Sequence, residues 1–584
     1  MQNRLWFLGT FIFLCLSCSD ESKQLGIKSL SSHLKDPHSK PDYVVKTPDY
    51  LAQNWDHETR MTWWYTSQGS QILPYKWFLA LEQSDNTQLF STKTNLEAYR
   101  FISWPADPKW NPDGLPIGFV ADTDRTGNRY FGVTCAACHT SKVAYKGKEV
   151  LVEGGPAHHD FDRFITDLTF ALQQTHDNHD KFKRFVKNVL GFNATVAAIA
   201  DLKQQLSKIN VKLGQRVSVN HPPHANGYAR LDAFGNIFNE VAVFALNEPS
   251  NANVANAPVS YPMLWDTPQH DVVQWNGSAV NAGIGAYARN VGEVVGVFGD
   301  LQLQAVKAGD KPEIKLSHHI NINNLNRLET ILTTLWSPLW PAMLPLINQQ
   351  QASLGKQLFA AHCVGCHENI KRDDPNRKII AKLIPIDAVG TDPLAATNIL
   401  TRKAKTGILE GQPNVPLAAL IPDLPLFNAT TFSVELVKYG VLGVLRDGLA
   451  QKTLLEGLPA FKAAATKNAL KEHCDPVKVG AECLHPPRYK ARPLNGIWTS
   501  APYLHNGSVP NLWDLLQKPS QRVAKFNVGS WEMDPVKVGF NIHAEPASSE
   551  FNTLLPGNSN NGHDYGTALS VEEKWALLEY LKTL

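Results

Sequence analysis

The strongest constraint in this sequence is a five-residue pattern that occurs twice. Residues 135–139 read "CAACH" and residues 363–367 read "CVGCH", each with two cysteines three positions apart and a histidine after the second. A zinc site would need four ligands and no histidine at that position. A redox disulfide would be expected in a thioredoxin-like βαβ setting, which the flanking sequence does not indicate. C-x-x-C-H is the attachment pattern of c-type haem.

The repetition of the pattern favours haem attachment over a chance match. Four cysteines would be bonded to the haem vinyl groups: Cys135, Cys138, Cys363 and Cys366. The histidine after each pair reaches the iron from one side. The sequence therefore predicts two covalently bound haem c groups with His139 and His367 as proximal ligands.

The N-terminus indicates export. Arg4 precedes the apolar run "LWFLGTFIFLCLS", which is too short to span a bilayer and ends just before Cys18. Residues 1–18 are expected to be an export signal and residues 19–50 a polar tether. Two alternatives stay open. One is an ordinary cleaved signal. The other is a lipoprotein signal, in which a lipid bonded to Cys18 attaches the protein to a membrane. Cys15 stands where leucine is usual in lipoproteins.

The expected location is thus the periplasm or the outer face of the cell envelope. Cys474 and Cys483 lie close together, so in that oxidising compartment they are expected to form a disulfide, with unpaired thiols as the alternative. The chain has 584 residues, 43% of them apolar, and a formal net charge of +2. Such a near-neutral chain offers no electrostatic reason to expect a nucleic-acid partner.

Helical patterns suggest two haem domains. Leu354, Leu358 and Phe359 have helical spacing before the second motif, and Ser570 with Glu573 forms a capping box at the start of a closing helix. A C-terminal cytochrome c domain is therefore expected at 350–584. An N-terminal haem domain is expected at 51–345, with helices at 160–190 and 194–214. The predicted fold is mainly α with extensive irregular loops, in two cytochrome-c-like domains that each carry a covalent haem c.

An irregular stretch at 256–283 is rich in Asn, Pro, Gly and Trp. Stretches of this kind often line ligand sites, although a surface loop with packed tryptophans is the alternative. His270 within it could act as an acid/base group or a ligand on the open side of the first haem. His158 and His159 are expected at the surface or at a helix start.

Residues 489–516, "YKARPLNGIWTSAPYLHNGSVPNLWDLL", and the closing segment "GNSNNGHDYGTALSVEEKWALLEYLKTL" carry a family resemblance. Together with the two motifs they resemble the bacterial dihaem cytochrome c peroxidases, closest to the branch of the rubber-cleaving dihaem oxygenases. The resemblance implies haems in close contact and oxidative chemistry at one of them. It implies that Trp265 and Trp275 lie near or between the haems and that His505 belongs to a loop at their interface.

The same resemblance implies a calcium ion bound partly by carbonyl groups of three consecutive residues: Ser500, Ala501 and Pro502. A serine stands there in place of the usual threonine.

Three residues could supply the second ligand of the second iron. His563 lies just before the closing helix, where a cytochrome c usually supplies its sixth ligand, and is preferred. His505 is the runner-up and Met533 the third candidate. The first motif has no comparable partner, so its iron is expected to keep an open position.

The ligand supply favours an enzyme that reduces hydrogen peroxide, or activates dioxygen, at the first haem and passes electrons through the second. The expected electron source is a donor cytochrome or another small redox protein. Three alternatives remain: an oxygenase that cleaves an apolar substrate, a plain electron-transfer cytochrome, and a scaffold or sensor that uses haem only structurally.

Overall fold

Short β-sheets alternate with helices along the chain. The computed structural model describes residues 47–281, 285–308, 311–416, 424–450 and 485–584. It has 38% helix and 17% strand, and every sheet in the described ranges contains two or three strands. The expectation of a mainly α fold is therefore wrong. The reason is local: segments such as 140–153, which turns at the positive-φ residues Lys146 and Gly147, form hairpins that a search for helical periodicity overlooks.

The helices of the described residues range from one turn to seven. They are α1 His57–Tyr65, α2 Tyr75–Ala80, α3 Lys93–Ala98, α4 Cys135–Cys138, α5 Phe161–Asp177, α6 His179–Leu190, α7 Val196–Asn220, α8 Ala233–Asn239, α9 Gly285–Gly296, α10 Ile322–Leu332, α11 Gln349–His362, α12 Ile386–Val389, α13 Leu394–Thr401, α14 Ser433–Ala450, α18 Leu512–Leu515 and α19 Val571–Leu581. A π-helical turn, Glu240–Ala245, continues α8.

The strands pair mainly with neighbours in the sequence. They are β1 Asp49–Tyr50, β2 Leu73–Pro74, β3 Phe119–Thr123, β4 Arg129–Val133, β5 Thr140–Tyr145, β6 Lys148–Glu153, β7 Arg230–Leu231, β8 Val259–Ser260, β9 Val272–Val273, β10 Ala279–Val280, β11 Leu301–Ala308, β12 Lys311–His318, β13 Lys382–Pro385, β14 Lys403–Lys405, β15 Thr430–Phe432, β16 Arg488–Ala491, β17 Lys525–Val528, β18 Met533–Asp534, β19 Gly539–Phe540 and β20 Ser549–Asn552. The three-stranded sheets have the orders β1-β6-β5 and β2-β4-β3. Among the two-stranded sheets, β13 pairs with β16 in antiparallel register, Lys382 opposite Ala491.

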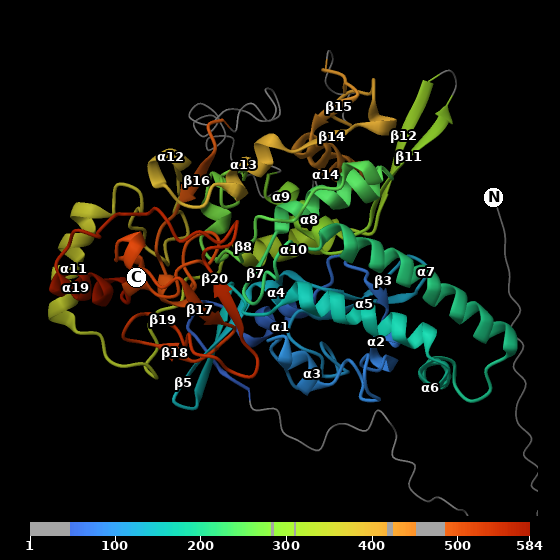
Figure 1. The fold of residues 1–584 in the computed structure, drawn as a ribbon, viewed down its shortest axis with the longest axis horizontal. Helices are drawn as coiled ribbons and strands as arrows, with labels where there is room; N and C mark the ends of the chain where they lie inside the picture. Colours follow the sequence, from blue (N-terminus) through green and yellow to red (C-terminus); the bar gives the residue numbers. More distant parts are fainter. Residues whose placement is uncertain (1–46, 282–284, 309–310, 417–423, 451–484) are drawn as a thin grey trace, which may run out of the picture. The chain divides into compact units, whose positions relative to one another are not determined.

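The helices expected at 160–190 and 194–214 are confirmed as α5, α6 and α7, which lie side by side in Figure 1. Asn178 separates the first two, because its side chain accepts hydrogen bonds from the backbone N–H groups of Asp180 and Lys181 and so starts α6. The third helix runs to Asn220, beyond the expected end. Each helix buries its apolar side in one aromatic-rich cluster around Phe164.

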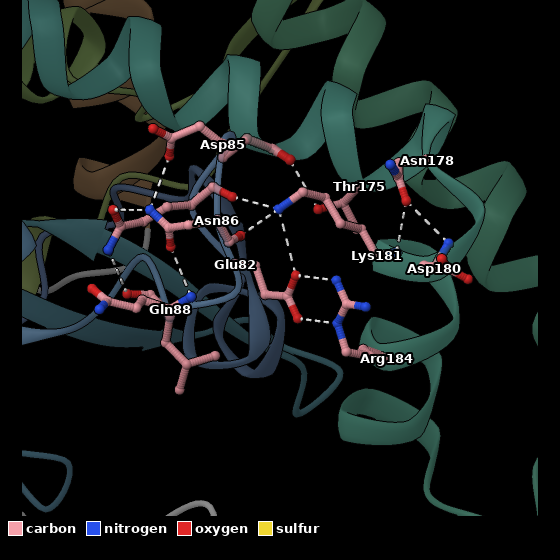
Figure 2. A network of polar contacts seen from close by, with 12 residues as sticks. Glu82, Asp85, Asn86, Gln88, Thr175, Asn178, Asp180, Lys181 and Arg184 are labelled. Atoms are coloured by element: carbon pink, nitrogen blue, oxygen red, sulfur yellow. Dashed lines mark hydrogen bonds and ion pairs between the residues drawn. The ribbon is translucent and has the colours of Figure 1, made fainter.

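A buried carboxylate ties α6 to the loop after α2 (Figure 2). Glu82 accepts two hydrogen bonds from Arg184, at 2.6 and 2.8 Å, and a third from Lys181 at 3.4 Å. Lys181 also donates to the carbonyl oxygens of Gln83 and Asn86. Since Glu82 is paired with two cations, its burial does not leave an uncompensated charge.

The first C-x-x-C-H motif is a single helical turn between two strands. β4 ends at Val133, and the Thr134 hydroxyl caps α4 by accepting from the N–H of Ala136. The same hydroxyl donates to the Trp64 carbonyl at 3.0 Å. β5 begins directly after His139, so strands on both sides determine the position of this motif.

The second motif follows a long helix, as expected. α11 ends at His362 and packs against α19, the closing helix, whose capping box between Ser570 and Glu573 is confirmed. Gly355 allows the close approach, because a Cβ there would lie 2.0 Å from the Ala576 carbonyl oxygen. The rings of Phe359 and Tyr580 fill the contact, with centroids 5.3 Å apart.

One hydrophobic cluster contacts both motifs. It contains Trp64 and Ala136 from the first part of the chain and Phe359 and Leu577 from the last. The described residues, from 47 on, also belong to one compact unit. The division into domains at 51–345 and 350–584 stays a prediction.

The expected irregular stretch 256–283 contains only two-residue strands and one short 3-10 turn over the part that the structure describes. None of the helices in the described ranges is long and apolar enough to cross a membrane. The export signal, residues 19–46 of the expected tether, Cys18 and the expected Cys474–Cys483 disulfide lie outside the described residues. The last residues of the expected tether are described, and Asp49–Tyr50 form strand β1, paired with β6.

Candidate haem sites

Each C-x-x-C-H motif lines a large cavity. The first cavity is lined by Cys135, Cys138 and His139, and the second by Cys363, Cys366 and His367. Their empty spaces, including the openings toward solvent, are about 1560 Å³ and about 1530 Å³. Two cavities of nearly equal size, each beside two cysteines and a histidine, fit two copies of one bulky ligand.

In the first cavity, Gln68 orients the leading cysteine. The Cys135 N–H donates to Gln68 Oε1 at 3.2 Å, and Gln68 Nε2 donates to Cys135 Sγ at 3.1 Å. Burial lowers the pKa of His139 to about 4, although the nearby Pro262 carbonyl raises it in part. The imidazole is therefore neutral at physiological pH, which is the form that binds iron.

In the second cavity, two histidines face each other. His367 and His563 have ring centroids 6.3 Å apart. Imidazoles that share one metal ion at bonds of about 2 Å have centroids about 6 Å apart, so the separation fits a single iron between them. His367 Nδ1 lies 2.8 Å from the Arg492 carbonyl oxygen, which leaves Nε2 for the metal. Burial lowers the pKa of both rings, to about 4 for His563, so both are neutral.

The segment that carries His563 is held on two sides. The His563 N–H donates to the Val389 carbonyl at 2.7 Å, and the residue adopts a left-handed backbone with φ of 51°. Gly562 lies directly on α12's end, where a Cβ would be 2.2 Å from the carbonyl carbon of Gly390. On the other side Arg522, which is 5% exposed, donates to five backbone carbonyl groups: Leu515, Gln517, Asn560, Gly562 and His563.

The other candidates for the second iron are not opposite His367 in this way. His505 lines the second cavity, but its ring stacks on Tyr489 with centroids 4.0 Å apart. Met533 is buried on β18 and is not among the described residues that line the second cavity. Among the described residues, His563 is the histidine that shares a ring contact with His367.

Three residues of the irregular stretch were expected near the haems: Trp265, His270 and Trp275. One of them lines the cavities. Trp275 lines both cavities, and its Nε1 donates to the Ser260 carbonyl at 2.9 Å. Trp265 is fully buried, donates to the Asn495 carbonyl and lines neither cavity. His270 is also buried away from both, with Nδ1 2.8 Å from the Asp266 carbonyl.

Polar groups of the first cavity were missed by sequence reasoning. Glu293 on α9 accepts a hydrogen bond from Gln274 at 2.8 Å, and Arg289 on the same helix bonds Glu329 at 2.5 Å. Burial raises the pKa of Glu293, while Gln274 and Arg289 oppose this shift. The available signal was an Arg289–Glu293 pair with i, i+4 spacing in an otherwise apolar helical segment.

Basic residues of the wall between the cavities were missed too. Lys490 and Arg492 line both cavities. Burial lowers the pKa of Lys490 well below its ordinary value and that of Arg492 to about 10.

Two further expectations concern residues outside the cavities. His158 and His159, expected at the surface or a helix start, precede α5 but are only 3% and 1% exposed. Apolar neighbours such as Phe540 and Phe101 enclose them. Among the described residues, no group of three or more His, Cys, Asp or Glu could hold a metal ion. Calcium near Ser500 would depend on carbonyl oxygens and stays a prediction.

Comparison with known proteins places the chain in a family. It is 31% identical to the uncharacterized protein y4iJ of Sinorhizobium fredii (strain NBRC 101917 / NGR234), over 93% of this chain and 94% of that protein. The chain belongs to the family of this protein. A shorter match, 32% identical over 16% of this chain and 27% of the relative, is to the uncharacterized protein y4iM of the same organism.

Residues 488–527 match the RoxA-like, cytochrome c-like family model. The match supports the rubber-oxygenase-like branch, and it implies covalently bound haem c and a haem-containing oxidoreductase or oxygenase-like function. The family model matches one cytochrome-c-like segment of this chain, so the expectation of two cytochrome-c-like domains is wrong. The physical reason is visible in the local folds, since the first motif lies between strands β4 and β5 rather than after a long helix.

Proposed function

We propose that this protein is a dihaem c oxidoreductase that reduces hydrogen peroxide, or activates dioxygen, in the first cavity and receives electrons at the second. Iron with an open coordination position binds and reduces such oxidants, whereas iron held by two protein side chains passes electrons. Cys135 and Cys138 would hold one haem with His139 as its ligand. Cys363 and Cys366 would hold the other between His367 and His563.

A difference in histidine supply carries this proposal. The second cavity has His563 facing His367 at 6.3 Å. Of the described residues that line the first cavity, His139 is the one histidine. No methionine is among those described lining residues either. The first cavity therefore keeps a side where an external molecule can reach the metal.

The chain's own residues support proton and electron delivery. Peroxide reduction consumes protons, and Glu293 presents a carboxyl group to the first cavity. Burial raises the pKa of this carboxyl group, so it keeps a proton for delivery to higher pH than an exposed glutamate does. Gln274 holds that carboxyl group in place by a hydrogen bond of 2.8 Å. Trp275 lies in the wall common to both cavities and so offers an aromatic path between them.

Exposure of the second motif supports electron entry there. Val364 and Gly365, between the cysteines of the second motif, are exposed, whereas Ala136 and Ala137 in the first motif are buried. A donor cytochrome or another small redox protein would therefore contact the second motif. We propose that this happens in the periplasm or at the outer face of the envelope, after export by residues 1–18, with or without a lipid at Cys18.

An oxygenase that acts on an apolar substrate is the second candidate. Leucine side chains from two elements face the first cavity: Leu231, Leu325, Leu328 and Leu332. Such a lining suits a hydrocarbon as well as it suits a haem face. The match to the RoxA-like model favours this candidate over a scaffold or sensor role.

Cyanide binding followed by low-temperature electron paramagnetic resonance tests the proposal. Cyanide should convert the haem of the first cavity and leave the haem between His367 and His563 unchanged. The double variant Cys135→Ala/Cys138→Ala should lose that response together with all turnover. Cyanide binding at the second haem, or at neither, would contradict the proposal.

Two turnover assays on the same protein identify the oxidant. Peroxide consumption with a reduced donor cytochrome supports the peroxidase, and oxygen uptake with an apolar polymer supports the oxygenase. Glu293→Gln is expected to slow peroxide turnover while leaving the resting spectra of both haems intact, because it removes a proton and not a ligand.

A further inference from the structure

Two basic side chains lie in the wall that separates the cavities. Lys490 and Arg492 line both cavities, and Trp275 is the other described residue that does so. Lys490 belongs to β16, and Arg492 directly follows the strand. Residues two apart in an extended chain point to the same side, which explains how both reach this wall. Both also lie within the segment that matches the RoxA-like model.

Arg492 is buried without an acidic partner among the described residues. It is 8% exposed, and its two Nη groups donate to the carbonyl oxygens of Met263 at 2.9 Å and Trp265 at 3.0 Å. Its Nε has no hydrogen-bond partner in the part of the chain that the structure describes. Asp266, whose charge acts on Arg492, already forms an ion pair with Arg377 at 2.6 Å. A buried guanidinium with a free donor indicates a missing acceptor.

Lys490 is in a similar position. Its Nζ donates to the Val272 carbonyl at 3.4 Å, a long contact, and Asp271 is the acid whose charge acts on it. Asp271 Oδ1 accepts from the backbone N–H groups of Val272 and Ala381. A lysine ammonium has three donors, so this environment leaves capacity for a further acceptor.

The charges that line the two cavities specify the acceptor. Among the described residues that line the second cavity, Lys490 is the only lysine and Arg492 is the only arginine. None of these lining residues is an aspartate or a glutamate. In the first cavity, Arg289 is the additional base, and it is already paired with Glu329. A haem group bonded to cysteines through its vinyl groups brings propionate carboxylates on its other edge, and these need cations.

We propose that Lys490 and Arg492 form one carboxylate-binding site, shared by the two cavities, that holds propionate groups of both haems. The inference rests on the proposed function in so far as it needs a haem in each cavity. It adds a consequence that the proposed function lacks. Because one pair of cations lies beside both haems, loss of one cation should change the reduction potential of both.

Spectroelectrochemical titration of the purified holoprotein tests this inference. Burial disfavours the charged form of Lys490, but a neighbouring propionate would keep the ammonium group protonated. Lys490→Met removes this positive charge and should lower the reduction potential of both haems, because the ferric state is then repelled less. Lys490→Arg keeps the charge and should stay close to wild type. The matched control is Lys382→Met on β13, the strand paired with β16, since Lys382 is exposed and lines neither cavity. Its potentials should not change.

Arg492→Gln provides a second measurement and should also lower both potentials, with Arg492→Lys restoring them in part. The inference is overturned if Lys490→Met leaves both reduction potentials unchanged or shifts the potential of one haem alone. It is also overturned if Lys490→Arg lowers the potentials as far as Lys490→Met does. Resonance spectra of the same samples test the proposed function separately. Two six-coordinate haems would contradict the proposed function, while the potentials would still decide the carboxylate site.

Discussion

His563 is the single residue on which the difference between the two cavities depends. Replacing His563 with Ala should turn the second haem high-spin and let it bind cyanide, because the ring opposite His367 is gone. Absorption and electron paramagnetic resonance spectra would measure the change. The control is His505→Ala, which removes a ring stacked on Tyr489 in the same cavity and should leave the low-spin signal in place. A high-spin second haem in the control alone would make His505 the ligand.

His158 should make the protein sensitive to acid. Burial lowers its pKa to about 3, so the folded chain keeps it neutral while the unfolded chain binds a proton below about pH 6.5. The contribution of His158 to the free energy of unfolding is therefore complete above that pH, and it is lost as the pH falls toward the pKa of the folded protein. His158→Phe should remove this loss of stability, which amounts to at most about 1.4 kcal/mol per pH unit. Guanidinium unfolding of both proteins over that range would show it, and parallel pH profiles would contradict it.

At the scale of elements, Arg522 positions the segment 560–563 that presents His563. Arg522→Gln should weaken this hold, because the guanidinium donates to the carbonyl oxygens of Gly562 and His563. Cyanide is then expected to bind the second haem at a measurable rate, and added imidazole should restore the low-spin signal. Arg446→Gln, at a partly exposed arginine paired with its neighbour Asp447, is the control. Equal cyanide rates in the two variants would exclude this positioning role.

Elements with a strong local signal could be predicted, and the others could not. α11 and α19 were found from apolar spacing and a capping box, which are properties of the segments themselves. The strand setting of the first motif was missed, because β4 and β5 are stabilised by partners in β3 and β6. The burial of His158 beside Phe540 likewise depends on residues far away in the sequence.

For the whole molecule, we expect two haems per chain. Pyridine haemochrome quantitation should give two for the wild type and one for Cys363→Ala/Cys366→Ala. This variant should also be less stable, since the second cavity would lose the ligand that fills it between α11 and α19. One haem in the wild type would contradict the expectation.

The sequence by itself predicts the covalent chemistry of this protein. Haem attachment needs only five adjacent residues, so the motifs Cys135–His139 and Cys363–His367 could be recognised without any fold. The tertiary structure decides what surrounds each proposed haem site. His563 and His367 are 196 positions apart in the sequence, and they meet only because α12 and Arg522 hold the His563 segment in place. Glu293, Lys490 and Arg492 become site residues only through packing, which brings distant side chains to one cavity and removes the water that would otherwise screen their charges.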